Sequence, residues 1–350
     1  MISVGMINFA FLNPPIGLAR YMRKVIRILS KDIDITTYCF KGEERFDTRD
    51  IDVRFVDWNL FKLFGMRRHD VIITTGTIES YMAFIVKLFK PSLKIIAETH
   101  HIPGKNRGFT NSLLNLFGEF LMDKFDAVIT VSDFWKRKIS RKYKISKNKI
   151  YVATVGIEDV KMKDKIKFKL DLSHPIIYDG ITSPEHNLEL IVKSMPLIKK
   201  KLGNATLLLT GRKDERYFEK IMAMSRYYDI DIIHLGVLSE ENLSDVYRQI
   251  DIVAYVPTEE IGWSAVLLKG ILYKKPSIAS NRGALKELVN RYDGIIVKNN
   301  VKSFSDAVIK LVKNKKLRDK IIKNAYDKAV RDTWFNTAKI HLDCIKEVIK

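Results

Sequence analysis

Residues 232–289 read IIHLGVLSEENLSDVYRQIDIVAYVPTEEIGWSAVLLKGILYKKPSIASNRGALKELV, and this stretch decides the fold. Its short apolar runs have the length and composition of buried strands, and the segments between them place apolar residues at helical spacing. The strand runs lie at 230–235, 252–255 and 276–279, and the helical segments lie at 239–249 and 265–272. Strands that alternate with helices predict a parallel sheet built from right-handed crossovers.

The same alternation extends outward to both ends of the chain. In the first half we expect strands at 2–9, 33–38, 53–56, 71–74, 94–97, 127–131 and 150–153, with helices such as 19–29 and 113–124. In the second half the remaining strands are expected at 175–178, 205–210 and 294–297, and the remaining helices at 187–201, 215–228 and 303–313. The pattern therefore runs through one complete set of strands and then starts again.

A polar, Lys-rich stretch at 156–173 separates the two sets and is typical of a linker. A chain of 350 residues also exceeds what one hydrophobic core usually organises. We therefore predict two doubly wound, Rossmann-like α/β domains, at 1–155 and 156–333. Ligands of such domains bind beyond the carboxyl ends of the strands, so the sequence predicts a site in the cleft that the two domains face.

The composition limits the compartment and the partners. The chain carries 61 Lys and Arg against 41 Asp and Glu, a net charge of +20, which favours nucleic acid, acidic membrane surfaces or phosphorylated small molecules as partners. Its two cysteines, near opposite ends, form no disulfide framework or metal-ligand spacing. No basic leader pattern opens the chain, and no apolar run approaches the ~18 residues of a membrane span. We expect a cytoplasmic protein.

The best candidate for a phosphate cradle lies in the stretch quoted first, at Gly262, Trp263, Ser264 and Ala265. Glycine permits a close backbone approach, Ser264 can cap the helix that follows, and the first amides of a helix have no partner within it. The alternative is an ordinary capped helix.

Cationic and imidazole side chains follow other expected strand ends. Arg212 and Lys213 follow the strand at 205–210 and could contact a phosphate, although a solvated charge cluster is the alternative. His100 and His101 follow the strand at 94–97, and a histidine often packs or titrates without a function.

Several segments, in order, resemble the retaining GT-B glycosyltransferases of family four, which use nucleotide-sugar donors. They are residues 130–158, 176–212, 232–289 and 332–345, with looser matches at NPPIGLARYMRKVIRIL (13–29) and ETHH (98–101). The resemblance implies a GT-B fold and transfer of a sugar, with retention, to a glycan, lipid or protein acceptor. It also implies that residues 334–350 form a helix that returns to the first domain.

The resemblance also assigns roles within each half. It places the loop at Gly17 near the donor phosphates, although a plain turn is the alternative there, and it sets a histidine, here His100, beside the transferred sugar. It places the diphosphate on the segment from Gly262. No metal or other cofactor is expected, because the donor half lacks an Asp-x-Asp pair at a strand end. The Asp229-Ile230-Asp231 triplet precedes its strand instead.

The departures from the family concentrate at its charged positions. Gly180 is followed by Ile181 where the family has Arg, and His186 stands at the family's Lys. The family's Glu-x7-Glu motif falls on Ile261 and Lys269.

Two acidic residues, Glu259 and Glu260, lie just upstream of that motif, and Glu260 could serve as its first Glu through a one-residue bulge. Lysine cannot accept a hydrogen bond from ribose, but it can contact a phosphate. Lys269, His186 and Arg212 could therefore replace the missing cations of an active enzyme. Alternatively the chain is a catalytically silent nucleotide-sugar-binding or scaffold protein.

A dense basic run, KRKISRKYKISKNK at 136–149, bears on the partners. It reads either as a solvated helix face or as a surface for anionic lipids, which would make the protein peripheral on a membrane. The apolar segments at 58–64 and 109–125 could add to such a surface or could belong to the core. Specific nucleic-acid binding is not expected, because the chain carries no helix-turn-helix, zinc-finger or RNA-recognition motif.

Overall fold

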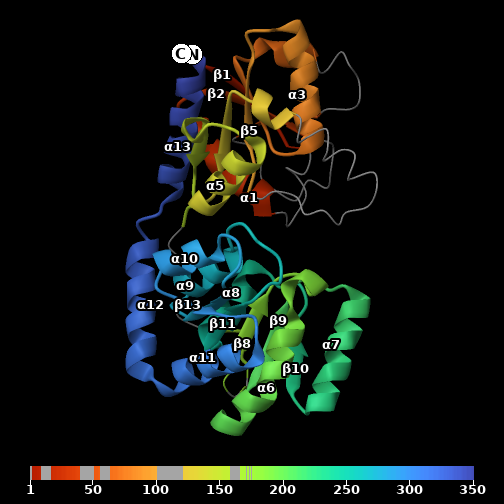
Figure 1. The fold of residues 1–350 in the computed structure, drawn as a ribbon, viewed down its shortest axis with the longest axis vertical. Coiled ribbons are helices and arrows are strands. Elements are labelled where there is room, and N and C mark those ends of the chain that lie inside the picture. Colours follow the sequence, from red (N-terminus) through yellow and green to blue (C-terminus); the bar gives the residue numbers. More distant parts are fainter. Residues whose placement is uncertain are drawn as a thin grey trace. The chain divides into compact units, whose positions relative to one another are not determined.

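The computed structural model describes residues 2–8, 17–39, 51–55, 64–100, 121–157, 166–170, 172, 174 and 176–350. The chain forms two compact units (Figure 1). The first unit comprises Met1–Gly156 together with Asp332–Lys350, and the second comprises Ile157–Arg331.

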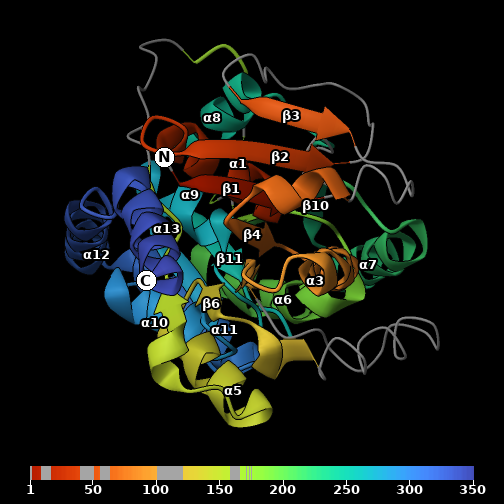
Figure 2. The same cartoon turned by 90° about the horizontal axis from the view of Figure 1, so that it is seen from above.

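The first unit is built on a seven-stranded parallel sheet in the order β3-β2-β1-β4-β5-β6-β7 (Figure 2). Its strands are β1 (Ser3–Ile7), β2 (Asp34–Cys39), β3 (Asp52–Phe55), β4 (Val71–Thr74), β5 (Lys94–Glu98), β6 (Ala127–Thr130) and β7 (Ile150–Val152). Its helices are α1 (Gly17–Leu29), α3 (Thr77–Phe89), α5 (Asp133–Tyr143) and α13 (Trp334–Ile349), with 3-10 turns at Gly65–Arg68, Met122–Lys124 and Lys147–Lys149. The central strands are buried on both faces, which explains why they read as continuous apolar runs.

Helix α13 brings the last residues of the chain back to the first unit, where it packs on α1, β6 and β7 (Figure 1). Gly156 makes the approach possible, because a Cβ atom there would lie 2.4 Å from Cα of Trp334. The Thr337 hydroxyl donates a hydrogen bond to the carbonyl of Thr154 at 2.7 Å. The helix is therefore fixed at the end of β7.

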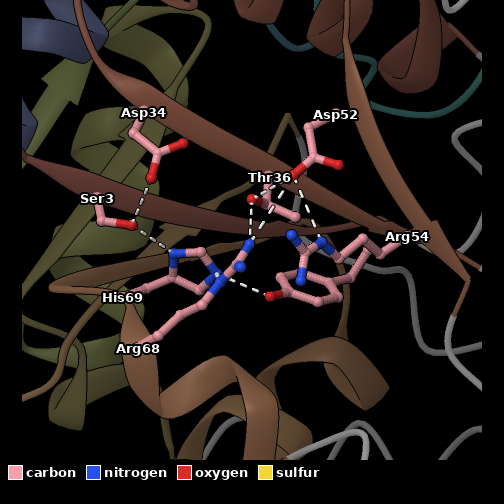
Figure 3. A network of polar contacts seen from close by, with 8 residues as sticks. Ser3, Asp34, Thr36, Asp52, Arg54, Arg68 and His69 are labelled. Atoms are coloured by element: carbon pink, nitrogen blue, oxygen red, sulfur yellow. Dashed lines mark hydrogen bonds and ion pairs between the residues drawn. The ribbon is translucent and has the colours of Figure 1, made fainter.

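A polar network around His69, which lies just before β4, links Ser3 at the amino end of β1 to side chains along β2 (Figure 3). The ring is fully buried, with Nδ1 2.9 Å from Ser3 Oγ and Nε2 2.8 Å from Tyr38 Oη. The Arg68 Nε–H also donates to Nε2, at 3.3 Å. Gly5 leaves the space that the ring needs, since a Cβ there would lie 2.8 Å from Cδ2 of His69.

The second unit is built on a six-stranded parallel sheet in the order β10-β9-β8-β11-β12-β13. Its strands are β8 (Ile176–Asp179), β9 (Thr206–Thr210), β10 (Asp231–His234), β11 (Ile252–Tyr255), β12 (Ser277–Ser280) and β13 (Ile295–Val297). Its helices are α6 (Leu188–Leu202), α7 (Glu215–Tyr228), α8 (Glu240–Gln249), α9 (Ala265–Leu272), α10 (Leu285–Arg291), α11 (Val301–Lys313) and α12 (Lys315–Ala329), with a 3-10 turn at Pro184–His186.

The expected linker is partly bound to the second unit. The buried carboxylate of Asp245, on α8, accepts hydrogen bonds from the amides of Lys167 and Phe168 at 2.9 and 3.0 Å. Gln249 holds the amide of Leu170 and the carbonyl of Phe168. Residues 166–170 are thus anchored to α8.

The expected strands differ from the observed ones by no more than two residues at either end. The sequence did not indicate α10, which is short, or α12, which is charged along most of its length. The expected helix at 113–124 lies outside the described residues up to position 120. In the part of the chain that the structure describes, no helix combines the length and apolar character that crossing a membrane requires.

Candidate functional site

The carboxyl ends of the second sheet carry two loops that are fixed to each other. The loop after β11 donates to the loop after β8, through the Thr258 amide and hydroxyl to the Glu185 carbonyl at 3.1 and 3.3 Å. In the other direction, the Asn187 side-chain amide donates to the Val256 carbonyl at 3.0 Å. From neighbouring segments, Ser280 and Asn299 both donate to the Pro257 carbonyl.

Two glycines with positive φ bring backbone against backbone at this edge. Gly283, at φ +55°, lies under the loop after β11, and a Cβ there would lie 2.4 Å from the Ile261 carbonyl oxygen. Gly211, at φ +87°, lies against the loop after β8, and a Cβ there would lie 2.4 Å from the Gly180 carbonyl oxygen. Any other residue would meet backbone as well as an unfavourable conformation. Both loops are thus held closely in place.

Helix α9 begins at this edge with a buried serine cap. The Ser264 hydroxyl accepts from the Leu267 amide at 3.4 Å, and the Ser264 carbonyl accepts from Leu268 at 3.2 Å. The amides of Ala265 and Val266 therefore lie outside the hydrogen bonds of the helix, at its positive end. Ala265 is exposed and Gly262 is buried.

Three buried donors at this edge have no hydrogen-bond partner within the described residues: Thr182 Oγ1, Ser183 Oγ and Trp263 Nε1. Leaving such a group unsatisfied costs about 1–3 kcal/mol, which a bound oxygen-rich ligand can recover. Together with the start of α9, they form a set of donors suited to an anionic ligand.

The fold matches that of solved glycosyltransferases along the whole chain. HepE of Anabaena, solved with UDP and glucose, superimposes with a TM-score of 0.80 over 99% of both chains, at 13% identity. A glycosyltransferase from Rickettsia africae superimposes with a TM-score of 0.80 over 100% of this chain and 99% of its own, at 18% identity. These likenesses show the GT-B fold.

Two family models divide the sequence between them. Residues 15–160 match Glycosyltransferase Family 4, and residues 162–328 match Glycosyl transferases group 1. By family, the chain is a GT-B glycosyltransferase. An uncharacterized glycosyltransferase of Methanocaldococcus jannaschii is 22% identical over 220 residues, which are 62% of this chain and 58% of that relative.

The glycosyltransferase's second unit brings together Gly180, Arg212, Gly262 and the start of α9 at one sheet edge. Arg212 is exposed, and its carbonyl accepts from the Thr182 amide at 2.8 Å. The Lys213 ammonium lies 3.1 Å from Glu215 and 4.4 Å from the centre of the Phe218 ring, so its partners lie on α7, the helix that follows it.

The other predicted charged positions differ in what they can supply. Burial lowers the pKa of His186 despite the nearby Glu185 carboxylate, so its imidazole is neutral at pH 7 and offers no fixed positive charge. Lys269 is half-buried on α9, one turn beyond its start. Glu259 and Glu260 lie exposed before Ile261.

In the first unit, Gly17 is the first residue of α1, and His100 lies just beyond β5. Its Nε2 atom is 2.9 Å from Oε1 of Glu98, the last residue of β5. Oε2 of Glu98 is 2.9 Å from Nε2 of His341, on α13. His101 lies outside the described residues. That the first-unit and second-unit residues meet in one cleft stays a prediction.

Sequence reasoning missed Thr182, Ser183, Glu98 and His341. The first three could have been found, because each follows the end of an expected strand. The same criterion led the sequence analysis to Arg212 and His100. His341 is different, since 243 residues separate it from Glu98 in the sequence. No group of three or more potential metal ligands occurs among the residues the structure describes.

Proposed function

We propose that this glycosyltransferase moves a sugar from a nucleoside diphosphate sugar to an acceptor. The observation that carries the proposal is the donor set at the carboxyl edge of the second sheet, where the loop after β8 holds unsatisfied buried hydroxyls and the loop after β11 leads into the start of α9. Cleavage of the sugar–phosphate bond leaves additional negative charge on the diphosphate. Amides, hydroxyls and an arginine that are held in place before the reaction stabilise that charge most effectively.

Three components contribute to the proposed diphosphate site. The amides of Ala265 and Val266 supply the helix end, Thr182 and Ser183 supply hydroxyl donors, and Arg212 supplies the cation. Hydrogen bonds to charged groups contribute about 1.5–3 kcal/mol each. This set takes the place of the Arg and Lys that the family usually carries. The neutral imidazole of His186 then contributes no positive charge to the diphosphate site.

The sugar and the acceptor complete the proposal. We assign His100 to a hydroxyl of the transferred sugar, and we include retention because the segments that resemble family four are those of retaining enzymes. HepE was solved with UDP and glucose, which makes UDP and UDP-glucose the first ligands to test. The acceptor is a glycan, lipid or protein, and the basic helix α5 favours one at an anionic membrane surface.

A second candidate, a silent nucleotide-sugar-binding protein, is favoured by one observation. Lys269 stands where the family carries the second Glu of its motif, so a contact to the ribose hydroxyls is lost. Such a protein would bind the nucleotide sugar without cleaving the bond between the sugar and the phosphate. Calorimetry with UDP and UDP-glucose, combined with chromatography of released UDP, separates the two functions.

The site itself is tested by Ala265→Pro. Proline is favoured at the first position of a helix, and Ser264 is already extended, so the substitution removes one amide donor while preserving α9. We expect the affinity for UDP to fall by about tenfold or more, the equivalent of one hydrogen bond to a charged group.

Glu240→Pro is the matched control, because it makes the same change at the start of α8, which Ser239 caps in the same way. We expect it to leave UDP affinity within about twofold. Undiminished affinity in a folded Ala265→Pro protein would show that the phosphates bind away from α9.

A further inference from the structure

The first unit contains a carboxylate buried between two imidazoles. Glu98 is 1% exposed and His341 is fully buried, while the His100 side chain retains 16% exposure. Each Glu98 oxygen lies 2.9 Å from one imidazole Nε2. The cluster therefore links the end of β5 to the returning helix α13.

The hydrogen bonds of His341 define where its protons lie. Its Nδ1 is 2.9 Å from the Thr337 carbonyl oxygen, which can only accept, so Nδ1 carries a hydrogen. The contact between Nε2 and Glu98 then needs one more proton, held either by His341 or by Glu98.

The electrostatics favour the ion pair. Burial acts to raise the pKa of Glu98, but His341 and His100 outweigh it and hold that pKa well below its ordinary value. Burial acts to lower the pKa of His341, but the Glu98 carboxylate and the Thr337 carbonyl raise it overall. His341 is thus an imidazolium and Glu98 a carboxylate.

An ionised Glu98 determines the state of His100. A carboxylate only accepts hydrogen bonds, so His100 must donate through its Nε2–H. In the neutral ring this leaves Nδ1 as an acceptor. The Tyr21 ring meets the His100 ring edge-to-face, with centroids 4.6 Å apart, and the Tyr21 hydroxyl is itself tied to the Ala153 carbonyl. Ring plane and tautomer are therefore both set by buried neighbours.

We propose that His341 is a positioning residue, which keeps Glu98 ionised so that Glu98 holds His100 in its Nε2–H tautomer. His100 then accepts a hydrogen bond from a sugar hydroxyl through Nδ1. This inference rests on the proposed function for the role of the hydroxyl, but the charge and tautomer assignments stand on the geometry of the first unit. Holding a catalytic imidazole in one tautomer by a buried carboxylate is a strong contribution in other enzymes.

The other titratable groups around Glu98 do not confuse the test. Among the residues that the structure describes, they are Tyr21 on α1 and Cys344 on α13, and burial together with the Glu98 carboxylate raises the pKa of both. Both stay neutral at pH 7, so neither changes the charge of the cluster near neutrality.

The first measurement needs no variant. Nitrogen-15 spectra of the full-length protein at pH 7 should show His341 protonated on both nitrogens and His100 protonated on Nε2. A neutral His341, or a His100 ring protonated on Nδ1 alone, would overturn the proposal.

The second measurement uses His341→Gln, which offers Glu98 an uncharged donor. We expect kcat for sugar transfer or donor hydrolysis to fall at least tenfold while KM for the nucleotide sugar stays within about twofold. The His100 spectra should change to a mixture of tautomers. The control is Lys339→Gln, which removes one positive charge from an exposed position of the same helix and should change neither quantity.

Unchanged kcat and an unchanged His100 tautomer in His341→Gln would also overturn the proposal. If the unsubstituted protein shows no turnover with any donor, the proposed function fails instead. The spectra then still decide whether His341 sets the tautomer of His100.

Discussion

Two fully buried histidines of the first unit, His69 and His341, differ in charge. His69 lies just before the amino end of β4, among the hydroxyls of Ser3 and Tyr38 and the cation of Arg68 (Figure 3). Burial, and then Arg68, lower its pKa to about 4, so the ring is neutral. His341 meets the carboxylate of Glu98, and its pKa is raised. Full burial is therefore compatible with a neutral imidazole and with a charged one, and the partner decides which occurs.

The positions of the two clusters in the sheet match this difference. In a parallel sheet, ligands bind beyond the carboxyl ends of the strands, while the amino ends serve stability. The neutral His69 lies just before the amino end of β4 and bonds Ser3 at the amino end of β1, whereas the Glu98 ion pair lies at the carboxyl end of β5. We therefore expect changes at His69 to affect folding alone and changes at Glu98 to affect folding and turnover.

The largest effect should follow Glu98→Leu, which leaves a buried imidazolium without its counter-ion. Removing one partner of a buried ion pair costs about 3–5 kcal/mol, and urea unfolding measures it. Glu347→Leu is the control, because this glutamate lies exposed on α13 and should change the free energy of unfolding by no more than about 0.5 kcal/mol. Equal effects of the two substitutions would refute the buried ion pair.

A smaller effect is expected at Gly5, which tests how rigidly His69 is held. Gly5→Ala places a methyl group 2.8 Å from a ring that is fixed at both nitrogens, so the ring cannot move without losing hydrogen bonds. We expect destabilisation of about 1–3 kcal/mol with turnover unchanged. Gly65→Ala, where a Cβ would have nothing within 4 Å, should be nearly neutral. A neutral Gly5→Ala would mean that the ring can shift freely.

The smallest expected effects concern the pH dependence of folding stability. The contributions of the two histidines to that dependence have opposite signs. Below pH about 6.5 the unfolded chain protonates His69 while the folded chain does not until about pH 4, so stability falls on acidification. The raised pKa of His341 acts oppositely, because its stabilisation is complete below pH about 6.5 and is lost as pH rises through the folded pKa.

Melting temperatures of two variants at pH 5, 7 and 9 measure this difference. His69→Gln should reduce the loss of stability between pH 7 and 5. His341→Gln should reduce the loss between pH 7 and 9. If His69→Gln changes the loss of stability between pH 7 and 9 instead, or His341→Gln the loss between pH 7 and 5, the assigned charge of that histidine is wrong.

The sequence predicted the strands well because buried parallel strands read as apolar runs, as in the VIIT sequence of β4. It predicted α12 poorly, because only Ala325 and Ala329 of that helix are buried and its charges hide the apolar face. A feature that depends only on neighbours in the sequence could also be predicted. An example is the cap that Ser264 provides for α9.

The parts of the site that escaped prediction depend on the folded chain. The hydroxyls of Thr182 and Ser183 look like ordinary turn residues until burial leaves them without partners. The charge of Glu98 depends on a helix that follows it by more than two hundred residues. Burial and long-range pairing are properties of the fold, so no local pattern records them.

Helix α13 reverses the order in which the two units are completed on the ribosome. Domains usually fold as they emerge, the N-terminal one first. Here every residue of the second unit has been made before the Asp332–Lys350 segment that completes the first. Until residue 341 is added, Glu98 lacks its buried cation and the end of β7 lacks the helix that covers it. The unit that is begun first is therefore finished last, and its nascent form is the one that chaperones and proteases would meet.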